Sequence, residues 1–174
     1  MTSPSTDALF LAMKPPPPRA LGWWLLSWPD FQRQFDALLG AVEALRAQDP
    51  DGYAHHPRVK LLATILRIIT ESVPRDPAHK DFRHGGKLGS EYTGWFRAKF
   101  HQRFRLFFRF DSQRKVIVYG WVNTESGLRQ EGGRNDPYVV FRRMLERGQP
   151  PTSFDELLRE SRGLRLPETG DADI

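Results

Sequence analysis

The sequence predicts a single α+β domain, in which helices pack on one face of a small antiparallel sheet. Three observations lead to this prediction. Apolar residues recur with the helical period of about 3.6 in the first half of the chain and again near its end. Between residues 95 and 123 the period changes to about 2, which is typical of strands. A chain of 174 residues is also long enough to bury a core without a disulfide.

Three segments are expected along the chain. Residues 1–20 include the proline run 15–18, which favours a stiff spacer over packed structure, so this segment is predicted to be disordered. Residues 21–166 form the single folded domain. Residues 167–174 are acidic and rich in turn-forming residues, and we expect them to form a flexible tail.

Four helices are expected in this domain. The first two begin near Pro29 and Pro57, because proline is favoured in the first helical turn, and Ser27 can cap the first of them. Two shorter helices follow Asp136 and Ser153, which are typical N-cap residues. Apolar residues along the helices predict packing against the sheet, and the wide apolar stripe of the helix that begins near Pro57 predicts burial on more than one side.

The strands are expected at residues 22–27, 95–101, 103–110 and 115–123. The last three are joined by short turns, so they should pair as antiparallel neighbours. In the strand 103–110 every second residue is apolar, from Phe104 to Phe110, and this face should contact the core. A slip of one residue would bury the charged positions between them, so the register is well determined.

The opposite face of the same hairpin is strongly basic. Its expected RNA-binding residues are Arg97, Lys99, Arg103, Arg105 and Arg109. Trp95 and Phe107 lie between them in the pattern. Guanidinium groups match the geometry of phosphates, and aromatic rings can stack on unpaired bases. The composition therefore predicts a surface for single-stranded RNA.

The overall charge agrees with an acidic partner. The net charge is +5, and residues 83–147 carry 14 Lys/Arg against 6 Asp/Glu, a local net charge of +8. Three alternatives remain open at this point. The basic face can be a solvated surface balanced by carboxylates from other elements, a non-catalytic RNA- or DNA-binding module, or a docking surface for an acidic protein.

The same surface has candidates for catalysis. RNA can be cleaved through its own 2′-hydroxyl without a metal, given a base, an acid and cations around the phosphate. The nearby ionisable residues are His84, Glu125, Asp136 and Tyr138. His84 lies between Arg83 and Lys87 in a glycine-rich basic loop that could wrap a phosphate and bind RNA. Each of the four also has a structural interpretation, as a loop residue, a helix cap or a packed helix residue.

No metal, cofactor or membrane is expected. The chain has no cysteine, and its five histidines do not follow a metal-ligand spacing. The N-terminus lacks the features of a signal peptide, and no apolar run is long enough to span a bilayer. These observations predict a cytoplasmic protein.

Several motifs together resemble those of a known family. They are Phe82-Arg83-His84-Gly85, residues 103–110 (RFRLFFRF), Gly120-Trp121-Val122-Asn123, Leu128-Arg129, residues 136–141 (DPYVVF), Met144-Leu145 and residues 147–151 (RGQPP). Over residues 21–160 this set is similar to the YhaV-type toxins, which are relatives of RelE.

The resemblance implies both a fold and a function. The fold would be the compact RelE-like microbial ribonuclease fold. The function would be that of an mRNA interferase from a type II toxin–antitoxin system, which cuts mRNA either free or on the ribosome and so inhibits translation. A PrlF-like antitoxin would neutralise it, and operator DNA would be bound only through the toxin–antitoxin complex.

The resemblance also implies roles for particular residues. Arg105 matches the catalytic arginine on the central strand, and Tyr138 takes the place of the family's tyrosine. The later arginine is Arg129 or Arg134; Arg129 is placed with the catalytic candidates and Arg134 with the RNA-binding ones. His84 and Glu125 complete the catalytic set.

Overall fold

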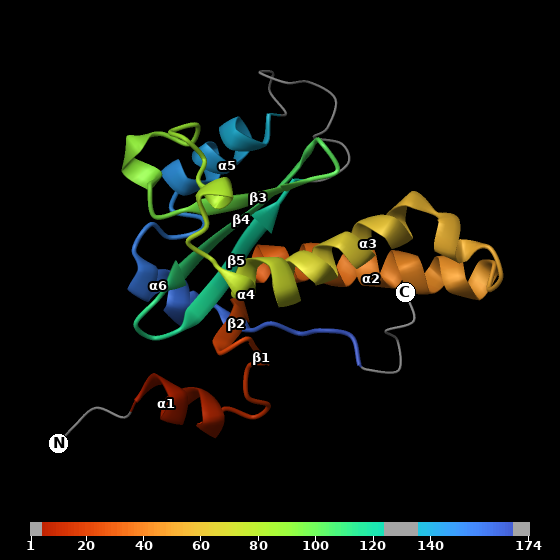
Figure 1. Cartoon of the computed structure of the whole chain (residues 1–174), viewed down its shortest axis with the longest axis horizontal. Coiled ribbons are helices and arrows are strands. Elements are labelled where there is room, and N and C mark those ends of the chain that lie inside the picture. Colours follow the sequence, from red (N-terminus) through yellow and green to blue (C-terminus); the bar gives the residue numbers. More distant parts are fainter. Residues whose placement is uncertain (1–4, 124–135, 169–174) are drawn as a thin grey trace.

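The computed structural model describes residues 5–123 and 136–168 (Figure 1). Its helices are α1 (Thr6–Ala12), α2 (Pro29–Gln48), α3 (Pro57–Arg67), α4 (Val73–Arg75), α5 (Pro137–Glu146) and α6 (Phe154–Glu160). Its strands are β1 (Arg19–Ala20), β2 (Trp23–Ser27), β3 (Phe96–Phe100), β4 (Phe104–Asp111), β5 (Val116–Val122) and β6 (Arg162–Gly163). A π-helical turn (Ile68–Ser72) joins α3 to α4. In the described part of the chain, no helix is long and apolar enough to cross a membrane.

The sheet is mixed and not purely antiparallel as predicted. Its strand order is β1-β2-β5-β4-β3, with β6 also paired to β2. The predicted antiparallel pairing of β3 with β4 and of β4 with β5 is confirmed. In contrast, β2 pairs in parallel with β5, from Trp24 opposite Val116 to Ser27 opposite Tyr119. A parallel pair requires a long connection, and local patterns do not specify which distant strand a short apolar strand will join.

Helices cover both faces of the sheet, which corrects the prediction of one covered face (Figure 1). On one face α2 and α3 pack against Ala98, Leu106, Phe108, Ile117 and Tyr119. On the other face α5 and α6 pack against Trp24, Leu26, Trp95, Phe107 and Val118. Trp95 and Phe107 are 2% and 0% exposed. These two rings are therefore core residues, and the expectation that they stack on RNA bases is wrong.

A β-bulge at Gly120 shifts the alternation of side chains along β5, so that Tyr119 and Trp121 face opposite sides of the sheet. Phe107 pairs with Trp121 but Phe108 pairs with Tyr119, so Gly120 is the extra residue. Tyr119 consequently belongs to the core beneath α2, whereas Trp121 packs on the α5 side. Only glycine fits at this position, because a Cβ there would lie 2.8 Å from Cζ3 of Trp95.

The N-terminal segment is more ordered than the composition predicts. Within the part of residues 1–20 that is described, α1 buries Phe10 against Trp24, with ring centres 5.3 Å apart. Trp24 Nε1 donates a hydrogen bond to Asp7 at 2.7 Å. The proline run alone predicts a stiff spacer. The structure shows in addition that Phe10 anchors α1 against the sheet.

Two of the three predicted helix caps are confirmed. The side chain of Asp136 accepts a hydrogen bond from the Tyr138 amide, and that of Ser153 accepts one from the Glu156 amide. Ser27 does not cap α2: it is the last residue of β2, and its hydroxyl donates to Gln32 at 2.8 Å. The parallel pairing with β5 extends the strand through Ser27, and the N-cap position passes to Trp28.

Two glycine-to-alanine substitutions should change the free energy of unfolding in opposite directions. Gly120→Ala should destabilise the protein by about 1–3 kcal/mol, because the added methyl group overpacks the core. Gly40→Ala should stabilise it by up to about 1 kcal/mol, because Gly40 lies inside α2 with open space around its Cα. Urea unfolding of the two variants measures both changes. Equal effects would contradict the proposed role of the bulge.

Candidate active site

Two arginines converge on one tyrosine where β3, β4 and α5 meet. The hydroxyl oxygen of Tyr138 accepts hydrogen bonds from Nε of Arg97 at 2.8 Å and from Nε of Arg105 at 3.3 Å. The ammonium of Lys87 lies 5.2 Å from the centre of the Tyr138 ring. We refer to Lys87, Arg97, Arg105 and Tyr138 as the arginine–tyrosine cluster.

The tyrosine is fixed by the start of α5. Asp136 caps this helix by accepting the Tyr138 amide at 2.8 Å, and Pro137 occupies the first helical turn. Phe107 contacts the Tyr138 ring edge to face, with centres 5.7 Å apart. The N-terminus of α5 adds the positive end of its helix dipole to the nearby cations. The Asp136 carboxylate already occupies this positive end, so attraction of a further anion depends on Lys87, Arg97 and Arg105.

Arg97 is the most buried cation of the cluster, with 6% of its surface exposed. Its Nη1 donates to the carbonyl of Asp81 at 2.6 Å, and its Nε donates to Tyr138. Both partners are neutral oxygens, and among the described residues no carboxylate forms an ion pair with Arg97. A buried charge without a counter-ion is costly. A bound phosphate would supply the missing negative charge.

Arg105 is only half-buried and has donors left for a ligand. Its Nη1 donates to the carbonyls of Gln102 and Phe104, at 3.0 and 2.8 Å. Within the described part of the chain, no group accepts a hydrogen bond from its Nη2. Lys99 stands directly opposite Arg105 across the β3–β4 pair and is exposed. Like charges in such pairs repel each other, and an anion between them removes that repulsion.

The start of β4 is held by a residue that sequence reasoning did not single out. Asn123, 3% exposed, accepts the Arg105 amide through Oδ1 at 2.7 Å. Its Nδ2 donates to the carbonyl of Arg103 at 3.0 Å. The Asn123 side chain thereby continues the hydrogen bonding between β4 and β5 beyond the end of β5. The signal available in the sequence was its place at the end of the Gly-Trp-Val-Asn motif.

His84 organises the loop that carries Lys87. Its Nε2 lies 3.0 Å from the carbonyl of Tyr92, which can only accept, so Nε2 carries the proton. Nδ1 accepts from the amides of Gly86 and Leu88 at 3.2 and 3.4 Å. Both ring nitrogens are thus engaged inside the loop, and the ring is 5% exposed. This arrangement gives His84 a structural role, whereas its catalytic role stays a prediction.

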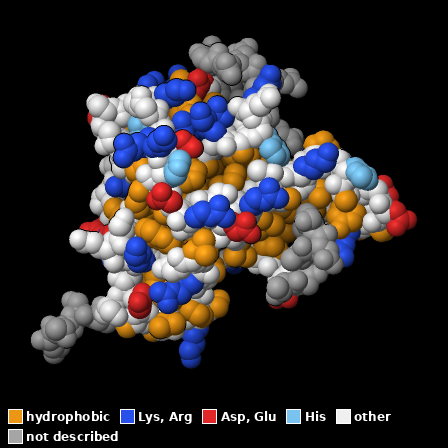
Figure 2. All heavy atoms as spheres, viewed as in Figure 1, with side chains coloured by type: hydrophobic (Ala, Val, Ile, Leu, Met, Phe, Trp, Pro, Cys, Tyr) orange, Lys and Arg blue, Asp and Glu red, His pale blue; other side chains and the backbone are white. Residues whose placement is uncertain are grey.

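The remaining basic candidates differ in their surroundings. Arg83, Lys87, Lys99 and Arg103 are exposed. On the face shown in Figure 2, lysine and arginine side chains gather over the upper part of the molecule. The candidates Glu125, Arg129 and Arg134 lie outside the described residues. In the part of the chain that is described, no group of three His, Asp or Glu side chains is placed to hold a metal ion.

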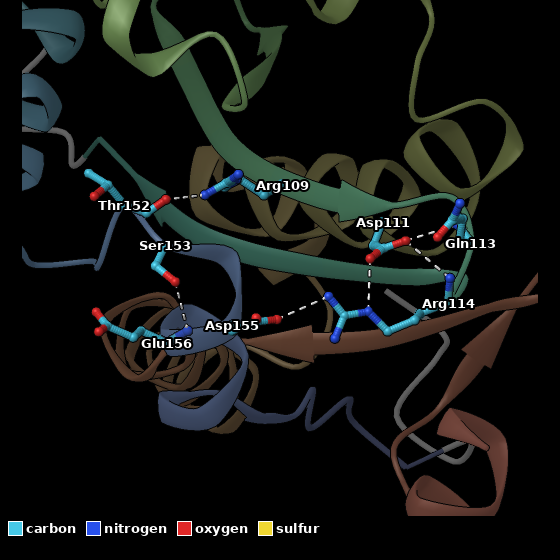
Figure 3. Close-up of polar contacts among 8 residues, drawn as sticks. All are labelled: Arg109, Asp111, Gln113, Arg114, Thr152, Ser153, Asp155 and Glu156. Carbon is cyan, nitrogen blue, oxygen red and sulfur yellow. Dashed lines mark hydrogen bonds and ion pairs between the residues drawn. The ribbon is translucent and has the colours of Figure 1, made fainter. Parts of the chain in front are cut away.

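Arg109, expected to bind RNA, is instead directed to the connection before α6 (Figure 3). Its Nη1 donates to the carbonyl of Thr152 at 2.5 Å, and its guanidinium lies over the rings of Trp95 and Phe154. Burial lowers the pKa of this guanidinium from its ordinary value. The structure therefore does not bring Arg109 together with the arginine–tyrosine cluster.

Arg114 anchors the β4–β5 turn to α6. Its Nε donates to Asp111 at 2.8 Å, and its Nη2 contacts Asp155 at 3.3 Å (Figure 3). Burial raises the pKa of the Asp111 carboxyl, but hydrogen bonds from Arg114 and from the Gln113 amide outweigh burial. The pKa consequently lies below its ordinary value of 3.8.

The fold and the cluster define a class of protein: a basic α+β protein in which two arginines and a lysine converge on one tyrosine. Comparison with protein families specifies the class further. Residues 25–162 match the Toxin_YhaV family, described as a toxin with endonuclease activity, of a toxin–antitoxin system. The chain belongs to this family. Membership favours the catalytic interpretation of the basic surface over a non-catalytic binding module.

Curated relatives support this assignment. The chain is 44% identical over 147 residues to the Ribonuclease toxin YhaV of Escherichia coli strain K12, covering 83% of this chain and 96% of the relative. The same identity and coverage apply to Toxin YhaV of Escherichia coli O6:H1 and of Escherichia coli O157:H7. No solved structure matches the chain significantly.

The lowered pKa of Asp111 predicts a pH-dependent contribution to stability. A carboxyl with a lowered pKa stabilises the folded state above its unfolded pKa, and the contribution is lost as the pH falls through the folded value. Asp111→Asn should therefore be less stable than the wild type at neutral pH, and the difference should shrink below about pH 4. Urea unfolding of both proteins at a series of pH values measures the difference in their free energies of unfolding. A difference that stays constant with pH would contradict the prediction.

Proposed function

We propose that the protein is a metal-independent endoribonuclease that cuts mRNA, and that the arginine–tyrosine cluster binds the scissile phosphate. The observation that carries the proposal is the convergence of Arg97 and Arg105 on the Tyr138 hydroxyl, with Lys87 beside it. Support for RNA as the substrate comes from the name of the K12 relative, a ribonuclease toxin. The RelE-like ribonuclease fold belongs to the same proposal.

In the proposed reaction, the 2′-hydroxyl oxygen of one nucleotide attacks the adjacent phosphorus. The new bond joins O2′ to phosphorus, and the bond from phosphorus to the 5′-oxygen breaks. This leaves a 2′,3′-cyclic phosphate and a 5′-hydroxyl. Arg105 and Arg97 stabilise the charge that develops on the phosphate oxygens, because such preorganised cations act strongly in a partly buried site.

Tyr138 is proposed as the acid of this reaction. Its oxygen already accepts two guanidinium hydrogen bonds, so the group it can still offer is its hydroxyl proton. That proton would pass to the departing 5′-oxygen. A separate base has to take the proton of the 2′-hydroxyl. Glu125 and His84 are the candidates, and the engagement of both His84 nitrogens favours Glu125.

The remaining predicted residues and partners extend this proposal. Arg129 assists at the phosphate, and Arg134, Arg83, Lys99 and Arg103 bind the flanking RNA backbone. An operon-encoded, PrlF-like antitoxin neutralises the enzyme, and operator DNA is bound through the toxin–antitoxin complex. Cleavage takes place in the cytoplasm, on mRNA that is free or on the ribosome.

Substitutions in the cluster test the proposed chemistry. Arg105→Ala should lower the rate of RNA cleavage by roughly 100- to 1000-fold, because a cation at the phosphate is lost. Tyr138→Phe should lower it by about 100-fold or more, because the proton donor is lost. Arg105→Lys should retain partial activity, since lysine keeps the charge but not the planar geometry. Purified variants and labelled RNA provide the measurement, and thermal unfolding shows whether each variant is folded.

The control is Arg67→Ala, which removes an exposed arginine from α3, on the other side of the sheet. Arg114 is unsuitable as a control because its ion pairs hold the β4–β5 turn. Arg67→Ala should cleave RNA at the wild-type rate and should arrest growth. A folded Arg105→Ala protein with wild-type activity would show that the phosphate binds elsewhere.

Metal independence is a separate prediction. With purified toxin and protein-free RNA, an excess of EDTA should leave the rate of cleavage unchanged, because the proposed cations are arginine and lysine side chains. The assay has to exclude ribosomes, whose own structure requires magnesium. Loss of cleavage on chelation, with recovery on adding back a divalent metal, would overturn this part of the proposal.

A further inference from the structure

Arg105, the cation proposed to act at the phosphate, lies just beyond the paired part of β4 and β5. Among the described residues, the register of these two strands ends at Leu106 opposite Val122. Beyond that pair, the buried side chain of Asn123 takes the place of a strand. Its Oδ1 accepts the Arg105 amide at 2.7 Å, and its Nδ2 donates to the Arg103 carbonyl at 3.0 Å. The position of Arg105 against the sheet therefore depends on one carboxamide.

The direction of the Arg105 guanidinium depends on the same segment. Its Nη1 donates to the carbonyls of Gln102 and Phe104, at 3.0 and 2.8 Å. In the sequence these carbonyls lie on either side of the Arg103 carbonyl, which Asn123 holds. Gln102 has a φ of 64°, a conformation that residues other than glycine rarely adopt, so the backbone preference of the turn does not keep it in place. The contact with Asn123 therefore helps to hold the carbonyls that orient the guanidinium.

The end of β5 is held in the same way from α2. The pairing of β2 with β5 ends at Ser27 opposite Tyr119, so in the described structure Val122 lies beyond it. The half-buried side chain of Gln34 takes the place of β2 here. Its Nε2 donates to the Val122 carbonyl at 2.6 Å, and its Oε1 accepts the Val122 amide at 3.1 Å. Gln34 thus fixes the residue directly before Asn123.

We infer that Asn123 and Gln34 are positioning residues for the cleavage reaction, and that both act through Arg105. Gln34 fixes Val122 from α2, and the next residue, Asn123, fixes Arg105. A displacement of about 1 Å can lower a rate by roughly 100-fold, even when its cause lies far from the chemistry. The inference rests on the proposed function, in which Arg105 stabilises the charge that develops on the phosphate.

Variants that lack one of these carboxamides should still fold. Both side chains border a cavity of about 350 Å³ between α2, α3 and the end of the sheet. A cavity of this size has room for water, and water can satisfy backbone groups that lose a protein partner. The backbone of Arg105 would then be less precisely placed in a protein that remains folded.

A double-mutant cycle with Arg105 tests the inference, using single-turnover cleavage of labelled RNA. Asn123→Ala should lower the maximal rate by roughly 10- to 100-fold and leave the half-saturating protein concentration nearly unchanged, because a misplaced cation affects the transition state more than binding. In the Arg105→Ala protein, the same substitution should change the residual rate by less than about twofold. Gln34→Ala should give a smaller loss with the same dependence on Arg105.

Gln32→Ala is the matched control. Gln32 is a buried carboxamide on the same helix, and it bridges the amide and the carbonyl of Arg165 at 3.0 and 3.2 Å. This bridge is of the same kind as that of Asn123, but it holds the segment after β6. Its loss should lower the Tm without lowering the rate of cleavage in either background.

Two results of the cycle would overturn the inference. An equal loss from Asn123→Ala with and without Arg105 would show that the carboxamide supports the fold and not the arginine. A loss confined to the half-saturating concentration would assign Asn123 to RNA binding. If Arg105→Ala alone cleaves at the wild-type rate, the proposed function fails at Arg105, so the two failures are distinguishable. Should Asn123→Ala not fold, Gln34→Ala decides by the same comparison.

NMR of the protein without RNA gives an independent result. The Nε–H signal of Arg105, identified by its absence in Arg105→Lys, should shift in Asn123→Ala and in Gln34→Ala. The Nε–H signal of Arg97, which donates to the same Tyr138 oxygen, should shift less, because Arg97 lies in β3 and Asn123 does not hold it. An unchanged Arg105 signal in both variants would overturn the inference, whether or not the wild type cuts RNA.

Discussion

The packing of Trp95 over Gly120 is the constraint on which the site depends. Because β5 has no side chain at this point, the indole can lie across the sheet, and the bulge turns Trp121 toward α5. Trp121 then stacks on Phe141 with the rings 12° from parallel. These aromatic contacts fix α5 against the sheet, and α5 in turn places Tyr138 over the arginines of β3 and β4.

Local sequence patterns were sufficient for most of the secondary structure and for one face of the sheet. The alternation in β4 specified that Leu106 and Phe108 face the core beneath α2 and α3, and the structure agrees. Alternation could not show that the opposite face of the sheet is also covered, because that face carries both arginines, which are typical of a surface, and aromatic rings, which are typical of a core. The parallel pairing of β2 and the bulge at Gly120 depend on contacts between distant segments, which have no local signal.

The site was predictable as a set of residue types but not as a geometry. Arg105 and Tyr138 were identified through the resemblance to a toxin family, and the structure brings them within hydrogen-bond distance. Arg97 looked equivalent to its neighbours on the strand, yet it is buried while Lys99 is exposed. Arg109 occupies the same face of the alternating pattern as Arg105, but its side chain extends toward Thr152. The difference arises from which loop or helix covers each position, and strand patterns do not contain that information.

The two residues that border positions 124–135 are each held by contacts outside that stretch. Asn123 is tied to the start of β4, and Asp136 is tied to the first turn of α5. Both ends of the intervening stretch are therefore anchored beside the cluster by contacts outside that stretch. A change in the length of this stretch would therefore leave Arg97, Arg105 and Tyr138 in place, because their mutual contacts lie outside it. The proposed roles of Glu125, Arg129 and Arg134, in contrast, depend on the stretch itself.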